Sequence, residues 1–222
     1  MENIKRVLSY TRRAVDDYQM IRAGDRIAIG ISGGKDSLTL LCALAELRRF
    51  YPEPFELEAI TIDMGLDGMD FSGVTELCRR LDVPYHTVPT QIAKIIFDVR
   101  KEPNPCSLCA KMRRGALHGA AVDLKCNKVA LGHHFDDVVE TFMLNLFFEG
   151  RLGCFQPVTY LSRRDLYLIR PMIYMPEKDV RYFASKAELP VVKSTCPEDG
   201  ETEREEMKKL LSVLERQNKG LR

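Results

Sequence analysis

Short apolar runs rich in β-branched residues alternate with longer segments of helical periodicity along the whole chain. The runs predict buried strands, and they lie at 26–31, 55–64, 84–90, 128–132 and 166–169. The other segments predict helices, and they lie at 3–21, 38–50, 71–82, 92–99, 106–124, 138–148, 176–187 and from 201 onward. This alternation predicts an α/β fold with an open, doubly wound, mostly parallel sheet and flanking helices.

We expect three parts, namely an N-terminal helix (1–24), a main domain (25–200), and a C-terminal surface helix with a tail (201–222). The length of 222 residues suits one such domain. A net charge of +1 gives no global electrostatic case for nucleic-acid binding, so such binding would depend on local patches.

Nothing in the chain predicts export or a membrane partner. The N-terminus lacks the apolar core of a signal peptide, and no run approaches the ~20 apolar residues of a membrane span. Seven cysteines in such a chain predict a reducing cytoplasm, and metal ligation rather than a disulfide framework.

The polar turn between the first predicted strand and its helix carries the strongest chemical signal. It reads Ser32-Gly33-Gly34-Lys35-Asp36-Ser37. Glycines let backbone N–H groups approach an anion, and a helix N-terminus favours negative charge. Ser37 offers a hydroxyl to a phosphate or to its metal ion. The turn does not match the GxxxxGK[ST] pattern, and a simple structural turn is the alternative.

Two further strand ends carry polar residues. Asp63 ends the strand at 55–64, and Gly132 to Asp137 (GHHFDD) follows the strand at 128–132. Ligands of open parallel sheets bind beyond the strand carboxyl ends, so Asp63 and Gly132 are placed to border a nucleotide. Asp136 and Asp137 fit helix caps, a Mg²⁺ site or a proton-transfer site. The histidine pair 133–134 raises the alternative of zinc, although neighbouring side chains on a strand end point in different directions.

A CxxC pair, Cys106 and Cys109, begins the helix predicted at 106–124, and residues 110–114 after it are basic. We expect the helix N-terminus to lower the pKa of these thiols. A CxxC alone fits a redox dithiol, half a zinc site or part of an iron–sulfur site, and the lack of a thioredoxin-like strand before it disfavours the redox role. The remaining cysteines except Cys196 lie in apolar surroundings and are expected to be core residues; they are Cys42, Cys78, Cys126 and Cys154.

Five segments together resemble the TtcA/TtuA family of PP-loop, iron–sulfur-dependent tRNA thiolation enzymes, with the closest resemblance to its TtcA-type tRNA-cytidine 2-sulfurtransferases. They are SGGKDS at 32–37, PCSLCAKMRR at 105–114, LGHHFDDVVETFMLN at 131–145, IRPMIYMPEKDV at 169–180 and STCP at 194–197. The resemblance implies the adenine nucleotide alpha hydrolase-like fold of a PP-loop ATPase. It also implies an ATP-dependent enzyme that adenylates a tRNA base, expected to be cytidine at C2, and replaces the oxygen with sulfur, releasing AMP and pyrophosphate.

The resemblance also implies roles for individual residues. Cys106, Cys109 and Cys196 would hold a [4Fe–4S] cluster with one iron not bound by protein, and their sulfurs should converge within ligand distance of one iron-sized centre. The catalytic residues implied are Asp36, Arg113 and Asp137, with Arg113 stabilising charge because arginine stays protonated. ATP, with Mg²⁺ screening its charge, would be bound by Ser32, Gly33, Gly34, Lys35, Asp36, Ser37, Asp63 and Gly132.

The implied partners are tRNA and a sulfur donor, either a cysteine desulfurase or free sulfide, and the protein is expected as a homodimer. Contacts to tRNA phosphates are expected from Arg12, Arg13, Lys111, Arg113, Arg114, Arg163 and Arg164. The chain lacks the extra zinc-binding CxxC pairs of TtuA-type members. The alternatives are a lysidine-synthetase-like ligase without sulfur chemistry, and a zinc-stabilised nucleotide-binding module in which a histidine completes the three cysteines.

Overall fold

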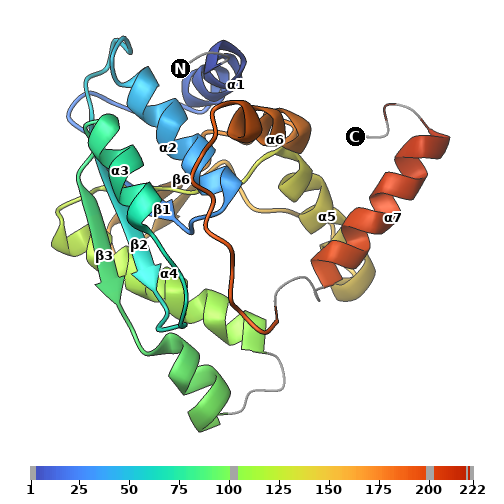
Figure 1. The fold of residues 1–222 in the computed structure, drawn as a ribbon. Helices are drawn as coiled ribbons and strands as arrows, with labels where there is room; N and C mark the ends of the chain where they lie inside the picture. The colour runs from blue at the N-terminus through green and yellow to red at the C-terminus, as the bar shows by residue number, and fades with distance from the viewer. Residues whose placement is uncertain (1–3, 101–104, 199–202, 219, 221–222) are drawn as a thin grey trace.

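The computed structural model describes residues 4–100, 105–198, 203–218 and 220. Within them, six strands form one sheet in the order β3-β2-β1-β4-β6-β5 (Figure 1). Five strands are parallel and β5 pairs antiparallel with β6. The strands are β1 (Arg26–Ile31), β2 (Glu56–Asp63), β3 (Tyr85–Pro89), β4 (Lys128–Ala130), β5 (Val158–Leu161) and β6 (Leu166–Ile169). The prediction of an open, mostly parallel sheet is confirmed.

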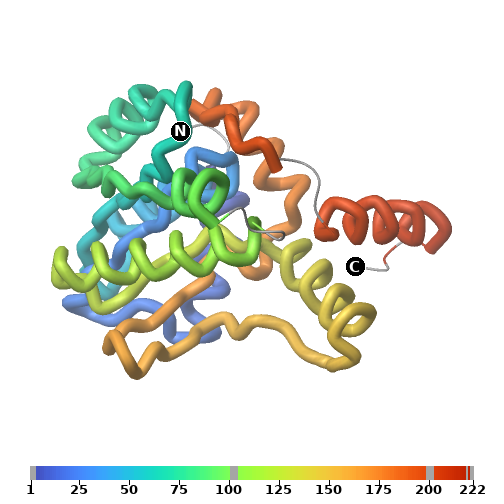
Figure 2. Tube along the Cα trace, turned by 90° about the horizontal axis from the view of Figure 1, so that it is seen from below, coloured from blue at the N-terminus to red at the C-terminus, as the bar shows by residue number. Residues whose placement is uncertain are grey.

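Helices cover both faces of this sheet, as expected for a doubly wound fold (Figures 1 and 2). The helices are α1 (Ile4–Asp17), α2 (Lys35–Leu47), α3 (Ser72–Arg80), a short π-helix η1 (Lys94–Arg100), α4 (Pro105–Asp123), α5 (Phe135–Glu149), α6 (Glu177–Lys186) and α7 (Glu203–Gln217). Helices α1, α2 and α6 pack together over one face, and α4 packs on β2 and β4 on the other. The larger apolar core lies under α2, which is buried at most positions because its Leu-rich sequence has no polar stripe. Among the described helices, none is both long and apolar enough for a bilayer span.

The order in which the strands are added across the sheet changes direction between the parallel neighbours β1 and β4. The chain runs outward from β1 to β2 and β3, and then starts again at β4 and runs the other way to β6. β1 and β4 are neighbours in register, with Ile29 opposite Ala130. Their carboxyl ends therefore lie side by side, and this topological switch point is where open α/β sheets bind ligands.

Several element boundaries differ from the sequence prediction. Strand β5 was not expected, because its four residues are half-exposed at the sheet edge and carry no apolar run. Helix α1 ends at Asp17 rather than at residue 21, and the short helix expected at 92–99 is a π-helix at 94–100. The predicted division at 200/201 lies outside the described residues and stays a prediction, as does the predicted tail at 219 and 221–222.

Candidate nucleotide and thiolate site

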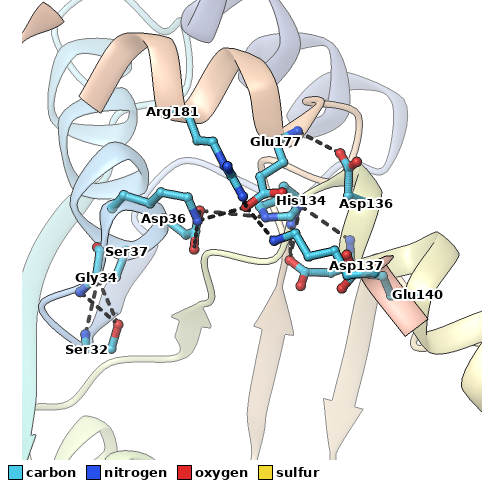
Figure 3. A network of polar contacts seen from close by, with 12 residues as sticks. Ser32, Gly34, Asp36, Ser37, His134, Asp136, Asp137, Glu140, Glu177 and Arg181 are labelled. Carbon is cyan, nitrogen blue, oxygen red and sulfur yellow. Dashed lines mark hydrogen bonds and ion pairs between the residues drawn. The ribbon is translucent and has the colours of Figure 1, made fainter. Parts of the chain in front are cut away.

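The loop from Ser32 to Ser37 joins β1 to α2 and is held by its own hydroxyls (Figure 3). Ser37 Oγ donates a hydrogen bond to the Gly34 carbonyl at 2.9 Å and accepts one from the Ser32 amide at 3.2 Å. Gly34 is the N-cap of α2, and no described side chain caps it. The first-turn amides of α2 therefore remain available to an anion, as a phosphate cradle requires.

Gly33 has to be a glycine for two reasons. Its φ is +84°, and a Cβ at this position would lie 2.8 Å from Cβ of Val192. The Val192 amide also donates to the Gly33 carbonyl at 2.9 Å. The segment after α6 is thus hydrogen-bonded to the loop at 32–37, which we call the phosphate loop. The same segment carries Cys196, four residues after Val192.

The turn after β4 packs directly against the start of α2. A Cβ on Gly132 would lie 3.0 Å from the carbonyl carbon of Asp36 and 3.1 Å from the amide nitrogen of Ser37. Only a glycine allows this approach, because the obstructing atoms are backbone. The structure therefore brings the two sequence-predicted turns together at the switch point.

His134 and Asp137 cap α5 reciprocally. The His134 amide donates to Asp137 Oδ2 at 2.8 Å, and the Asp137 amide donates to His134 Nδ1 at 3.3 Å. This cap starts α5 at Phe135, three residues earlier than predicted. Asp136 Oδ2 accepts a hydrogen bond from the Glu177 amide at 2.7 Å, which ties α5 to α6. Asp136 and Asp137 thus both serve as caps, and Asp137 also lines the cavity described next.

A cavity of about 630 Å³ opens at the switch point, a size that suits a nucleotide-sized ligand. It is lined by the loop residues Ser32, Asp36 and Ser37, by Gly132, His133 and Asp137, and by the arginines 113, 114, 170 and 204. A second cavity of about 230 Å³ shares Ser32 and Arg113 with it and is also lined by Asp63 and Ser194. The two cavities therefore bring together most of the residues predicted for the nucleotide, together with Arg113.

His133 is the neutral group of the larger cavity. Burial lowers its pKa to about 4, and Arg170 and Arg204 add to this against the opposing charge of Asp137. Its ring lies 4.9 Å from that of Phe155, and its Nδ1 is buried without a hydrogen-bond partner among the described residues. His133 therefore presents an uncharged imidazole to a ligand at neutral pH. It lies apart from the cap made by His134, so the two histidines do not act as a pair.

Glu177, at the start of α6, links the loop at 32–37 to α6 and to α7. Its Oε1 lies 3.2 Å from Lys35 Nζ, 2.9 Å from Arg181 Nη2 and 2.9 Å from Lys208 Nζ. Burial opposes the positive charge of Lys35, but Asp36 and Glu177 together raise its pKa. Ion pairs therefore hold Lys35 beside the loop, and no sequence pattern pointed to its partner Glu177.

The three predicted ligand cysteines lie in one neighbourhood. Cys106 and Cys109 are in the first turns of α4, and Cys196 follows α6, where its amide donates to Ser194 Oγ at 3.2 Å. Burial raises the pKa of Cys106 and Cys109, and the negative charges of the neighbouring thiolates raise it further. The expectation of lowered pKa values is therefore wrong, because burial and the neighbouring cysteines raise the pKa of Cys109 more than Arg113 lowers it, and nothing opposes them at Cys106 among the described residues.

The described residues contain no group of three Cys, His, Asp or Glu side chains arranged to hold one metal ion. The expectation that the three sulfurs converge on a single iron-sized centre is therefore wrong for this structure. Three cysteines still suit an iron–sulfur cluster, because each sulfur would bind a different iron atom.

Four of the seven residues predicted to contact tRNA lie in two separate places. Arg12 and Arg13 form ion pairs on α1 with residues one turn later, at 3.5 and 3.6 Å. Arg114 of α4 and Arg164 of the β5–β6 turn both lower the pKa of His118, after burial. This second group forms a basic patch beside the larger cavity, because Arg114 also lines that cavity.

Comparisons with known proteins identify the family. The PP-loop domain family matches residues 7–213. The chain is 42% identical over 217 residues to a tRNA-cytidine(32) 2-sulfurtransferase of Geobacter sulfurreducens, covering 96% of this chain and 84% of the relative. It is 44% identical over 208 residues to the enzyme of that name from Pelobacter propionicus, covering 92% and 77%.

Solved structures of two other proteins have the same fold. The U34-tRNA thiolase NcsA from Methanococcus maripaludis, with its [4Fe-4S] cluster, has a TM-score of 0.79 at 27% identity, covering 96% of this chain and 74% of that chain. An NH3-dependent NAD synthetase from Campylobacter jejuni shares the fold, with a TM-score of 0.56 at 14% identity over 100% of this chain and 87% of that chain. The chain belongs to the PP-loop domain family.

Proposed function

We propose that this protein is an ATP-dependent sulfurtransferase that adenylates a tRNA base, cytidine 32, and replaces the C2 oxygen with sulfur. The observation that carries the proposal is the smaller cavity, which Ser32 and Gly34 of the phosphate loop line together with Arg113 and Ser194. Arg113 lies one turn after Cys109, and Ser194 lies two residues before Cys196. The nucleotide loop and both cysteine segments thus border one space. The names of the relatives supply the base and the reaction.

The chain offers a group for each part of the adenylation. The α2 amides and Lys35 bind the phosphates, with Mg²⁺ neutralising part of their charge. The base oxygen attacks the α-phosphate, the bond to the β-phosphate oxygen breaks, and pyrophosphate leaves. Arg113 stabilises the developing negative charge, because its guanidinium stays protonated. Asp137 orients the attacking base, and Asp36, Asp63 and Gly132 border the nucleotide.

The donor set of Cys106, Cys109 and Cys196 fits a [4Fe–4S] cluster with one iron left without a protein ligand. When bound, that cluster supplies the coordination site at which a sulfur nucleophile is held for attack on C2, with AMP as the leaving group. Cys106 is exposed and Cys109 and Cys196 are half-buried, which leaves this site open to a large substrate. Arg114 and Arg164, which both act on His118 of α4, would bind tRNA phosphates.

Three finer points belong to the same proposal. A cysteine desulfurase or free sulfide supplies the sulfur, the protein acts in the cytoplasm, and it forms a homodimer. The support for a homodimer is a group of large apolar side chains that α5 leaves more than half exposed, Phe147 and Phe148.

The test is an assay with anaerobically purified protein, unmodified tRNA, ATP and sulfide. We expect AMP, pyrophosphate and 2-thiocytidine in equal amounts, together with iron and the visible absorbance of an iron–sulfur cluster. AMP and pyrophosphate without a thiolated base would instead support a ligase without sulfur chemistry. Bound zinc without iron would contradict the proposal.

A further inference from the structure

The C-terminal helix contributes a cation to the larger cavity. Arg204 lies in the first turn of α7 and lines this cavity with Ser32, Asp36 and Ser37 of the phosphate loop. Its side chain is 41% exposed, so solvent and a ligand both reach the guanidinium. No other described residue of α7 lines the cavity.

The present contacts of Arg204 are ones that a phosphate can replace. Its Nη1 lies 3.3 Å from Asp137 Oδ1 and 3.3 Å from Glu140 Oε2, and its Nη2 donates to Thr141 Oγ1 at 3.0 Å. Both carboxylate distances exceed the ~2.7–2.9 Å of a strong charge-assisted hydrogen bond. These long contacts leave the guanidinium able to turn to another anion.

The other cations around the loop reach the cavity from other directions or already have partners. Arg170 is buried, donates to the Gln156 carbonyl and stacks over Phe155. Lys35 lies between Asp36 and Glu177. Arg113 and Arg114 approach from α4, on the opposite face of the sheet from α2. Arg204 is thus the arginine that lines the cavity from the α5 side.

That side of the cavity needs positive charge. Asp137 lines it, and the buried Glu140 lies one turn further along α5. Burial and the charge of Asp137 raise the pKa of Glu140, and Arg204 opposes this shift. Without Arg204, these carboxylates would repel a polyphosphate that approaches the loop.

We propose that Arg204 is a nucleotide-binding residue: with ATP bound, its guanidinium turns from Asp137 and Glu140 to the phosphate groups. A guanidinium can bind two phosphate oxygens at once through two of its nitrogens. In the present contacts a single nitrogen, Nη1, faces both carboxylates, so this bidentate capacity is unused. The exchange also releases Asp137 Oδ1 toward the substrate base. Helix α7 is thereby part of the ATP site rather than a surface appendage. This inference rests on the proposed function, because it takes ATP as the nucleotide.

The experiment compares binding of Mg·ATP and of adenosine by calorimetry, for the wild type and for Arg204→Gln, Arg204→Lys and Arg216→Gln. Arg216 is exposed in the last turn of the same helix and is the matched control. We expect Arg204→Gln to weaken Mg·ATP binding roughly tenfold or more, because a charge-assisted hydrogen bond to phosphate is lost. Adenosine binding should be unchanged. The Mg·ATP affinity of Arg204→Lys should lie between those of the wild type and Arg204→Gln, and the affinity of Arg216→Gln should match the wild type.

Equal weakening of Mg·ATP and adenosine by Arg204→Gln would identify Arg204 as an anchor of α7 only and overturn the inference. Unchanged Mg·ATP affinity would overturn it as well. If Arg204→Gln does not fold, Arg204→Lys carries the test, since it keeps the charge and loses the fork. The assay contains neither tRNA nor sulfur, so a failure of the thiolation reaction and a failure of this inference are separate results.

Discussion

Substituting Glu177 by Gln removes the anion that three cations share. Its Oε1 contacts Lys35, Arg181 and Lys208, from the phosphate loop, α6 and α7. Burial alone would raise the pKa of Glu177, but the hydrogen bonds from Lys208 and Arg181 and the charge of Lys35 lower it to about 2. The folded state therefore binds the Glu177 carboxylate more favourably than the unfolded chain does.

The magnitude follows from the difference between this value and the ordinary 4.5 of a glutamate. At about 1.4 kcal/mol per pKa unit, the carboxylate contributes about 3 kcal/mol to the free energy of unfolding at pH 7. Because the folded pKa is the lower one, this stabilisation is complete above the unfolded pKa. It is lost as the pH falls from about 4.5 toward about 2, with roughly half remaining near pH 3.

The assay is urea denaturation at a series of pH values, with Glu188→Gln as the control, because Glu188 is exposed just after α6. We expect Glu177→Gln to lower the free energy of unfolding by about 3 kcal/mol at pH 7, and the difference from wild type to shrink below pH 4.5. Glu188→Gln should stay within about 0.5 kcal/mol of wild type. A Glu177→Gln difference that is below 1 kcal/mol at pH 7, or that does not change with pH, would refute the reasoning.

Three further predictions concern the site. Gly132→Ala pushes a Cβ into backbone at the start of α2 and should weaken ATP binding at least tenfold, whereas Gly115→Ala in α4, with open space around it, should leave ATP binding unchanged in the same titration. Burial lowers the pKa of His133 to about 4, so its imidazole should stay neutral in an NMR titration down to that pH. The free energy of unfolding should fall as the pH falls from 6.5 toward 4, because the unfolded chain binds this proton first. A titration midpoint near 6.5 would contradict this. Cys196→Ser should abolish iron–sulfur absorbance after anaerobic reconstitution, whereas Cys154→Ser, which changes a thiol outside the predicted ligand set, should keep it.

The strand–loop–helix units could be predicted from sequence because their signals are local. The apolar run before Ser32 and the leucines after Ser37 define one strand, one loop and one helix within about twenty residues. The same holds for the turn at Gly132. Parallel strands then bring both turns to one sheet edge by topology alone. The residues that border the nucleotide could therefore be predicted from the sequence.

Other features could not be predicted because they depend on distant partners or on competing effects. Arg204 contacts carboxylates more than sixty residues earlier in the chain, and no spacing pattern encodes such a pair. Histidine is not among the preferred N-cap residues, so the start of α5 at His134 gave no capping signal. The pKa of Cys109 was mispredicted because the helix dipole is readable from sequence, whereas burial and the nearby Cys196 are not.

The most direct test of the account is the nucleoside content of tRNA from cells that carry or lack this gene, measured by mass spectrometry. We expect 2-thiocytidine to disappear without the gene and to return with the wild-type protein. We also expect that neither Cys196→Ala nor Gly132→Ala restores it, because one removes a proposed cluster ligand and the other pushes a Cβ against the backbone of Asp36 and Ser37. Unchanged 2-thiocytidine in cells without the gene, or full restoration by Cys196→Ala, would contradict the central claim that ATP-dependent activation and thiolate-held sulfur chemistry act together in this site.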